Sequence, residues 1–224
     1  ECPGAAKCPS GGLCFAERAK YRAAAANVVV VNTHLYGIHV ASGGAILPEH
    51  DVVIFDEAHQ LEDTLTATVG VTISASRATT LATAMNKVVE DDKLLTELFD
   101  AAALLRTLFS PHIETRLSLP LPVDIVNQLN ALRITVNSCL DALRKIDSTL
   151  ETVRQKVLRA QTLASRFADD LDAVLRVSAT SVPFVSGTTE RPELVIAPLD
   201  VGPILAEFVW PLHTAIMTSA TIPL

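Results

Sequence analysis

The most constraining feature of the sequence is a short apolar run that ends abruptly in charged residues. Val52 to Phe55 are all apolar, so this run has no polar face and is typical of a strand buried on both sides. Asp56, Glu57 and His59 follow at once, with one alanine among them. Functional groups in an open parallel sheet gather outside the carboxyl ends of the strands. The pattern therefore predicts an α/β fold with a candidate site directly after Phe55.

Two adjacent carboxylates at a strand end suit phosphate chemistry. Asp56 can hold a hydrated Mg²⁺, and Glu57 can orient or deprotonate the water that attacks a γ-phosphate. The alternative is that both acids simply begin a helix, where they interact favourably with the helix dipole. These letters alone leave both interpretations open.

Composition narrows the class of protein. With 224 residues, the chain can form one large domain or two small ones. Hydrophobic residues make up 49% and aromatic residues 4%, so we expect a core of Leu, Val, Ile and Ala. The net charge of −7 gives no overall attraction to nucleic acid, although a local basic patch is compatible with it. No apolar run of about 18 residues is present, so no membrane span is expected.

Three of the four cysteines lie within the first fourteen residues. The crowding of Cys2, Cys8 and Cys14 is unlike a secreted disulfide framework and suggests a metal ion or cluster in an intracellular setting. Zinc usually takes four ligands with a tighter cysteine pair, whereas iron–sulfur clusters accept varied spacing. Three cysteines supply three ligands of either site, and a disulfide or free thiols are the remaining alternative. The chain begins with Glu1 and lacks an initiator Met, so we expect it to be part of a longer protein.

The segment after Cys14 is rich in alanine and long charged side chains and predicts a helix to about residue 26. Arg18 and Arg22 lie one turn apart on it, where they either contact phosphates or form a solvated face. Val28 to Val31 predict a second buried strand, which ends in polar residues that include Asn32 and His34.

The middle of the chain predicts mostly helices. We expect them over residues 57–68, 74–89 and 90–108, with a short strand or linker at 69–73 and a proline-rich loop at 112–122. From Val123 to Val177 there is no glycine or proline, and apolar residues alternate steps of four and three, as in a coiled coil. This repeat favours a single long or gently bent helix of up to roughly 80 Å, although 148–151 also fits a fresh helix cap. Cys139 falls on the apolar seam and is therefore predicted to be a core residue.

The last segment predicts a return to the sheet. Residues 180–186 and 193–198 predict two paired strands, followed by a short helix to about Trp210. Residues 214–217 predict another core strand, and Ser219 and Thr221 come just after it. We expect hydroxyls at this strand end to hydrogen-bond the Asp56–His59 segment of a neighbouring strand.

The order of these motifs along the chain resembles that of a known protein family. Along the chain come Cys-Pro-Gly, Cys-Pro and Cys-Phe, then the Ala/Arg-rich helix, then Val-Val-Val-Val-Asn-Thr-His and Val-Ile-Phe-Asp-Glu-Ala-His. This order of motifs resembles that of the XPD/DinG family of iron–sulfur superfamily-2 DNA helicases. The similarity is greatest to bacterial DinG-type members. Asp-Glu-Ala-His matches motif II of such helicases, and Ser219 to Thr221 match their Ser-Ala-Thr motif III.

The resemblance implies an α/β fold: part of a RecA-like parallel-sheet lobe, motor domain 1, interrupted by an all-helical Arch-like insertion that contains the long coiled-coil-like helix. The implied division is 1–26, the end of the iron–sulfur segment; 27–69, part of motor domain 1; 70–180, the insertion; and 181–224, the return to the motor domain. In the family the insertion stands over the motor and helps to enclose a single strand. A purely scaffolding or partner-docking role is equally compatible with the periodicity.

The resemblance also implies roles for residues. Asp56 would coordinate Mg²⁺ and Glu57 would activate water, while His59, with Ser219 and Thr221, would link the nucleotide state to the grip on DNA. Cys2, Cys8 and Cys14 would hold a [4Fe–4S] cluster whose other cysteine lies before Glu1, so little or no cluster is expected in this chain alone. The candidates for contact with single-stranded DNA are Arg18, Arg22, Asn32 and His34.

Two departures from the family pattern limit what we expect of this chain. It has no G-x-x-x-x-G-K-[ST] phosphate loop, and no second motor lobe follows Leu224. The parent would be a monomeric, bacterial, cytoplasmic DNA helicase that uses ATP and moves 5′ to 3′, whereas the fragment itself would be inactive. A non-catalytic DNA-binding or docking module with degenerate motor motifs is the competing hypothesis, and zinc is the alternative to the cluster.

Overall fold

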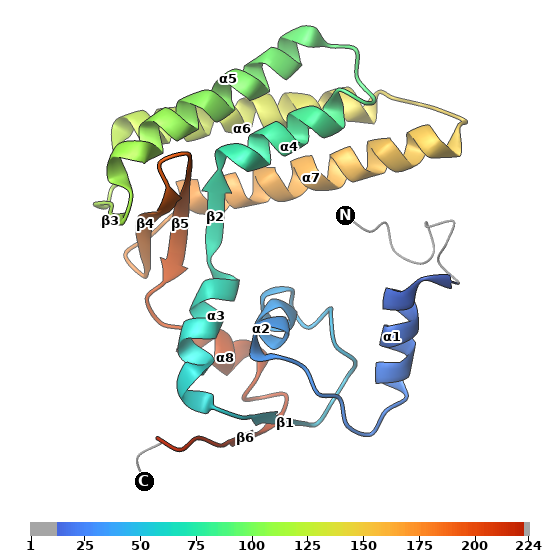
Figure 1. Ribbon diagram of the computed structural model, residues 1–224, viewed down its shortest axis with the longest axis vertical. Coiled ribbons are helices and arrows are strands. Elements are labelled where there is room, and N and C mark those ends of the chain that lie inside the picture. The colour runs from blue at the N-terminus through green and yellow to red at the C-terminus, as the bar shows by residue number, and fades with distance from the viewer. Residues whose placement is uncertain (1–12, 222–224) are drawn as a thin grey trace. The chain divides into compact units, whose positions relative to one another are not determined.

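The computed structural model describes residues 13–221 and divides them into two compact units (Figure 1). The helical unit comprises Val71–Ile196. The α/β unit comprises the described residues up to Gly70 and those from Ala197 onward. Within residues 13–221, no helix combines the length and the apolar character that a membrane crossing requires.

The α/β unit joins two stretches of sequence through a parallel strand pair. Its elements are α1 (Phe15–Ala24), α2 (Thr33–Ala41), β1 (Val52–Phe55), the short 3₁₀ helix η3 (Ala58–Gln60), α3 (Leu61–Val69), α8 (Gly202–Phe208) and β6 (Thr214–Met217). β1 and β6 run parallel, with Val52 opposite Thr214 and Phe55 opposite Met217. The strands predicted at 52–55 and 214–217 therefore lie side by side, as expected.

The core of the α/β unit lies on one face of this strand pair. Val53 and Phe55 are buried, and they pack with α2, α3 and α8 through a set of apolar side chains: Tyr36, Val40, Leu61, Leu65, Val201, Leu205 and Val209. Val52 and Ile54 on the opposite face are 51% and 63% exposed. The prediction that β1 is buried on both sides is thus wrong for the described residues, because only one face of the pair is covered.

The strand predicted at residues 28–31 does not form. Val28 and Val30 are 80% and 91% exposed, and the segment is extended without a paired neighbour in the part of the chain that the structure describes. A strand needs a partner for its backbone hydrogen bonds, and the described partner of β1 is β6. Asn32 instead caps α2, since its Oδ1 accepts a hydrogen bond of 2.7 Å from the Leu35 N–H.

The helical unit combines four long helices with a small antiparallel sheet. The helices are α4 (Ala75–Met85), α5 (Asp92–Phe109), α6 (Val123–Arg144) and α7 (Glu151–Leu175), with a 3₁₀ turn η4 at Ser110–His112. The strands are β2 (Val71–Ser74), β3 (Thr115–Arg116), β4 (Ser181–Thr188) and β5 (Arg191–Pro198), in the order β2-β5-β4-β3. Apolar residues from all four helices form one core with Ile73, Val185, Leu194 and Ile196 of the sheet.

The single long helix predicted over residues 123–177 is wrong. The helix breaks between Arg144 and Glu151, and α6 and α7 pack against each other. The apolar repeat keeps its phase through the break, so periodicity alone did not reveal it. The burial pattern shows the break, because Leu143 and Val157 are buried while Leu150 between them is 64% exposed. The alternative of a fresh helix after Ser148 is the one observed.

The prediction that the insertion, residues 70–180, is all helical is also incorrect, because β2 and β3 lie within these residues. The strands predicted at 180–186 and 193–198 do form, but they join β2 and β3 in the same unit as the helices. The expected division after residue 180 therefore differs from the division by contacts, which falls after Ile196. Strand propensity located β4 and β5, and their predicted pairing with each other is confirmed. Their outer partners, β2 and β3, are set by tertiary packing that the local pattern does not encode.

Candidate functional site

The candidate site lies where β1 and β6 end, and the strand register determines which residues face each other there. Phe55 and Met217 are the last paired residues, so the next residue on each strand is Asp56 and Thr218. Backbone hydrogen bonds continue past the strands, from Thr218 N to Phe55 O and from Ala58 N to Thr218 O, both at 2.9 Å. These bonds hold the two strand ends together across a separation of about 160 residues in the sequence.

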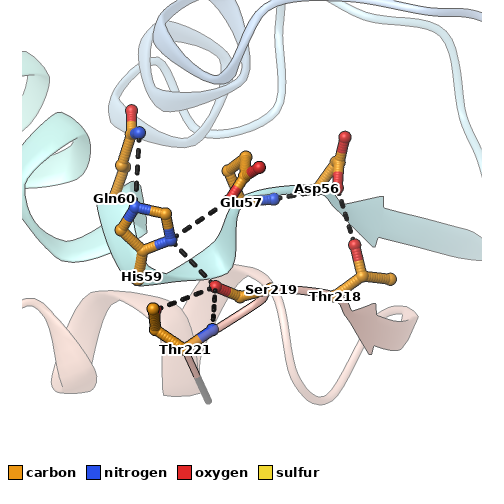
Figure 2. Close-up of polar contacts among 7 residues, drawn as sticks. All are labelled: Asp56, Glu57, His59, Gln60, Thr218, Ser219 and Thr221. Carbon is orange, nitrogen blue, oxygen red and sulfur yellow. Dashed lines mark hydrogen bonds and ion pairs between the residues drawn. The ribbon is translucent and has the colours of Figure 1, made fainter.

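Asp56 is exposed at this edge and is oriented by two donors (Figure 2). Its Oδ1 accepts a hydrogen bond of 2.7 Å from the Thr218 hydroxyl and one of 3.0 Å from the Glu57 N–H. Both bonds orient the carboxylate with respect to the strand ends. A carboxylate beside a hydroxyl is an oxygen donor set of the kind that Mg²⁺ prefers, so the residues present fit that ion.

Glu57 has a backbone conformation that is unusual for a residue with a side chain. Its φ of 52° and ψ of 47° lie in the left-handed region. Such a conformation costs on the order of 1–3 kcal/mol and persists where surrounding contacts enforce it, often at functional sites. The turn leaves the Glu57 side chain 57% exposed, with Oε2 3.3 Å from Nδ1 of His59. The acid is thus presented to solvent beside Asp56.

His59 connects the two segments through side chains. Its Nδ1 lies 2.8 Å from the Ser219 Oγ, and its Nε2 lies 3.4 Å from the Gln60 amide nitrogen. In the tautomer in which Nε2 accepts from the Gln60 amide, Nδ1 carries a proton and donates it to Ser219 Oγ. Ser219 Oγ also accepts from the Thr221 N–H at 3.3 Å and lies 3.2 Å from the Thr221 hydroxyl. Figure 2 shows this network across the two strand ends.

The structure brings together all five residues singled out by the sequence as catalytic candidates: Asp56, Glu57, His59, Ser219 and Thr221. Hydroxyls after β6 do hydrogen-bond the segment after β1, as expected. Two members of the network were not individually identified from the sequence, namely Thr218 and Gln60. Thr218 could have been identified from the sequence, because aligning the ends of the two predicted strands places it opposite Asp56.

The candidate DNA-contacting residues lie outside this network. Arg18 and Arg22 are exposed on α1, which has no buried residue. His34 is exposed in the first turn of α2, and Asn32 uses its side chain to cap that helix. Within residues 13–221, no hydrogen bond or ion pair joins these four side chains to Asp56, Glu57 or His59.

Of the cysteines singled out as metal ligands, Cys14 is a partly exposed free thiol just before α1. Cys2 and Cys8 lie outside the described residues. Across residues 13–221 there is no group of three His, Cys, Asp or Glu side chains arranged to hold a metal ion. Cys139 is buried in the core of the helical unit, as predicted, and burial raises the pKa of its thiol to about 12.

A cluster of aromatic and histidine side chains was not anticipated from the sequence. His50 and His213 precede β1 and β6, and their rings stack with centroids 4.2 Å apart. Tyr36 and His39 of α2 lie against the His50 ring and against each other. His39 is buried, and its Nδ1 accepts from the backbone N–H groups of residues 46 and 47 at 3.3 and 3.0 Å. The four residues come from three separate stretches, so no local pattern identifies them.

Comparison with known proteins identifies the class. No protein-family model matches the chain. Among curated proteins, the ATP-dependent helicase DinG of Mycobacterium tuberculosis H37Rv is 30% identical over 235 aligned residues, which cover 99% of this chain and 34% of that protein. The ATP-dependent DNA helicase YoaA of Haemophilus influenzae is 30% identical over 71% of this chain and 26% of its own length. YoaA of Escherichia coli K12 is 40% identical over 79 residues, or 34% of this chain and 12% of that protein.

These relatives are all ATP-dependent helicases, and the strand ends that carry Asp-Glu-Ala-His and Ser-Ala-Thr agree with that class. More specifically, the chain belongs with the DinG-type helicases, which confirms the family predicted from the motifs. It spans about a third of the length of the DinG proteins it matches.

Proposed function

We propose that this chain is part of an ATP-dependent DNA helicase and that β1 and β6 belong to its first motor lobe. The observation that best supports this proposal is the hydrogen bond between His59 and Ser219, which joins two motifs 160 residues apart. Two polar segments without a shared function would rarely follow adjacent strands in matched register, so their pairing supports a common site. The names of the similar proteins, which are ATP-dependent helicases, support the same proposal.

Asp56 and Glu57 divide the chemistry between them. Asp56, oriented by Thr218 and by the Glu57 N–H, would hold the Mg²⁺ that accompanies ATP. The ion supplies neutralisation of the developing charge on the phosphates. The solvent-facing carboxylate of Glu57 would orient the attacking water and take its proton. The left-handed turn at Glu57 supports this role, because it turns that side chain away from the strand and toward solvent.

His59 and Ser219 would transmit the state of the nucleotide. His59 Nδ1 is within reach of both Glu57 Oε2, at 3.3 Å, and Ser219 Oγ, at 2.8 Å. A change in charge at Glu57 during hydrolysis alters which of these acceptors the ring prefers. Movement of Ser219 and Thr221 would then pass to β6, which connects directly to them.

The exposed face of the strand pair supports a larger sheet in the whole protein. Val52, Ile54 and Ile216 lie on this face, are apolar and are 45–63% exposed. We infer that further parts of a RecA-like lobe cover this face, and that the helical unit is the Arch-like insertion of that lobe. The antiparallel sheet in the helical unit is then part of the insertion.

The remaining assignments rest on the family. Cys2, Cys8 and Cys14 would hold a [4Fe–4S] cluster together with a cysteine from elsewhere in the protein, and Arg18, Arg22, Asn32 and His34 would contact single-stranded DNA. The exposure of Arg18, Arg22 and His34 is compatible with such contacts. We further infer 5′-to-3′ movement by a monomer in the bacterial cytoplasm.

The direct test is Glu57→Gln in the full-length protein, which keeps the size of the side chain but removes its basicity. We expect ATP turnover to fall by at least about 10²-fold, as is typical when a general base is lost, while the Kd for ATP stays within about twofold. Glu62→Gln, an exposed acid in the first turn of α3, is the matched control and should keep full turnover. Turnover at the wild-type rate in Glu57→Gln would remove Glu57 from this role.

A further inference from the structure

Gln60 stands at the start of a helix but does not cap it. It is the last residue of η3 and occupies the N-cap position of α3. Short polar side chains at this position commonly accept a hydrogen bond from the first helical turn, whereas the Gln60 side chain makes no such bond. Its one side-chain hydrogen bond within residues 13–221 joins the amide nitrogen to Nε2 of His59, at 3.4 Å (Figure 2). The amide therefore acts on His59 instead of on the helix.

The backbone holds Gln60 and His59 in a tight turn beside the acids. The Gln60 N–H donates to Glu57 O at 2.9 Å, which closes the turn that follows the left-handed residue. His59 Nδ1 lies 3.3 Å from Glu57 Oε2 and 2.8 Å from Ser219 Oγ. The two ring nitrogens thus have different neighbours, because Nδ1 faces Glu57 and Ser219 while Nε2 faces Gln60.

One tautomer of His59 satisfies every contact in this network. A neutral imidazole has one N–H donor and one acceptor nitrogen, and a carboxylate only accepts, so Glu57 favours the proton on Nδ1. Nε2 then accepts, and the Gln60 amide supplies the donor. Ser219 Oγ accepts from the Nδ1–H and from the Thr221 N–H at 3.3 Å. The Ser219 hydroxyl can then donate to Thr221 Oγ1 at 3.2 Å.

The opposite tautomer loses part of the network. With the proton on Nε2, the Gln60 amide must rotate and present its oxygen in place of its nitrogen. The lone pair of Nδ1 then faces the Glu57 carboxylate at 3.3 Å, and the two acceptors repel each other. Ser219 must donate to Nδ1, and His59 no longer has a hydrogen bond to offer to Glu57.

We propose that Gln60 is a positioning residue that sets the tautomer of His59 and, with it, the direction of the hydrogen bonds between the two strand ends. The partner of one ring nitrogen determines whether the other nitrogen donates or accepts. When Gln60 donates to Nε2, the proton on Nδ1 is within reach of both Glu57 and Ser219. The consequence for coupling rests on the proposed motor function, because it requires the charge of Glu57 to change during ATP hydrolysis. The tautomer itself does not depend on that function.

The test is the tautomer of His59, measured by two-bond ¹H–¹⁵N correlations in the ¹⁵N-histidine-labelled chain at about pH 8, where a histidine of ordinary pKa is neutral. The signals that disappear in His59→Asn belong to this ring. We expect the wild-type ring to carry its proton on Nδ1. Gln60→Glu replaces the donor by an acceptor of the same size, so Nε2 should become protonated. Gln60→Lys, which only donates, should keep the wild-type tautomer.

Two further variants complete the experiment. Gln128→Glu adds the same charge at a partly exposed position of the helical unit and should leave the His59 signals unchanged. Gln60→Met removes the donor without adding a charge and should increase the share of the Nε2–H form. Gln60 is exposed, so these substitutions leave the core intact, and the signals of the other described histidines report on the fold.

A wild-type ring with its proton on Nε2 would overturn the proposal. An unchanged tautomer in Gln60→Glu or in Gln60→Met would do the same, because Glu57 and Ser219 would then set the tautomer without Gln60.

A kinetic measurement on the full-length protein tests the consequence. We expect Gln60→Glu to lower kcat for ATP turnover on single-stranded DNA at least about 5-fold, while KM for ATP stays within about twofold, because the nucleotide contacts are unchanged. Gln60→Lys should recover most of the turnover. Wild-type kcat in Gln60→Glu would remove Gln60 from the coupling. The turnover of Glu57→Gln is measured separately, so the motor role can fail while the tautomer assignment stands, and the reverse.

Discussion

At the scale of single residues, the site is defined by short polar contacts rather than by burial. Asp56, Glu57 and His59 are all exposed, and their geometry comes from hydrogen bonds to Thr218 and to Ser219. Asp56, Glu57 and His59 could be identified from the sequence because they follow an apolar strand in a known order. The left-handed conformation of Glu57 could not, since glutamate has no intrinsic preference for that region. It depends on the contacts that hold the turn.

The histidine cluster leads to a prediction about acid stability. His39 is buried beside His50 and His213, and burial, followed by the charges of those two rings, lowers its pKa from the usual value near 6.5. A folded state with a lowered histidine pKa binds fewer protons than the unfolded state. The stability due to His39 is therefore fully present above about pH 6.5 and is lost as the pH falls below that value. We expect the free energy of unfolding of the α/β unit, monitored by Trp210 fluorescence in urea, to decrease from pH 7 to pH 5.5.

His39→Asn is the informative variant, because its amide oxygen can still accept from the backbone N–H groups of Ile46 and Leu47 but does not titrate. It should be less stable at pH 7 and show a weaker dependence on pH. An unchanged pH dependence in His39→Asn would assign the effect to His50, His213 or other groups.

At the scale of elements, the sequence was most informative where a periodic pattern is long. The helical segments of the helical unit and both strands of the parallel pair were predicted because each has a helical repeat or a compact apolar run. The break between α6 and α7 was missed because the apolar repeat keeps its phase across residues 145–150. The stretch 28–31 was predicted as a strand because four valines favour one, yet strand formation depends on a neighbour and not on propensity alone.

Cys139 provides a test of the α6–α7 packing. Its thiol is fully buried and its pKa is raised to about 12, so almost no thiolate is present at pH 8. We expect Cys139 to react with a maleimide at least about 10²-fold more slowly than Cys14 in the native chain, and at a similar rate in urea. Peptide mass spectrometry separates the two sites, and Cys14, which is partly exposed, is the internal control. Comparable native rates would contradict the packing of this seam.

At the scale of the whole molecule, the candidate site forms because the chain returns to the α/β unit after building the helical unit. It leaves the α/β unit after Gly70, builds the helical unit, and returns at Ala197. Asp56 and Ser219 are far apart in the sequence, and the expectation that they meet came from polar residues at two predicted strand ends, together with the motif resemblance. The structure supplies the physical means, which is the register of β1 with β6. The sheet of the helical unit was not foreseen, because β4 and β5 were expected in the lobe to which the chain returns.

The pairing of these strand ends is the claim on which the motor assignment depends. Nuclear Overhauser measurements on the isotope-labelled chain test it directly, because the Ala58 amide donates to Thr218 O and the Thr218 amide donates to Phe55 O. We expect cross-peaks between the Ala58 amide proton and protons of Thr218 or Ser219. With those resonances assigned, the absence of every cross-peak between residues 55–59 and 217–219 would contradict the parallel pairing and the site built on it.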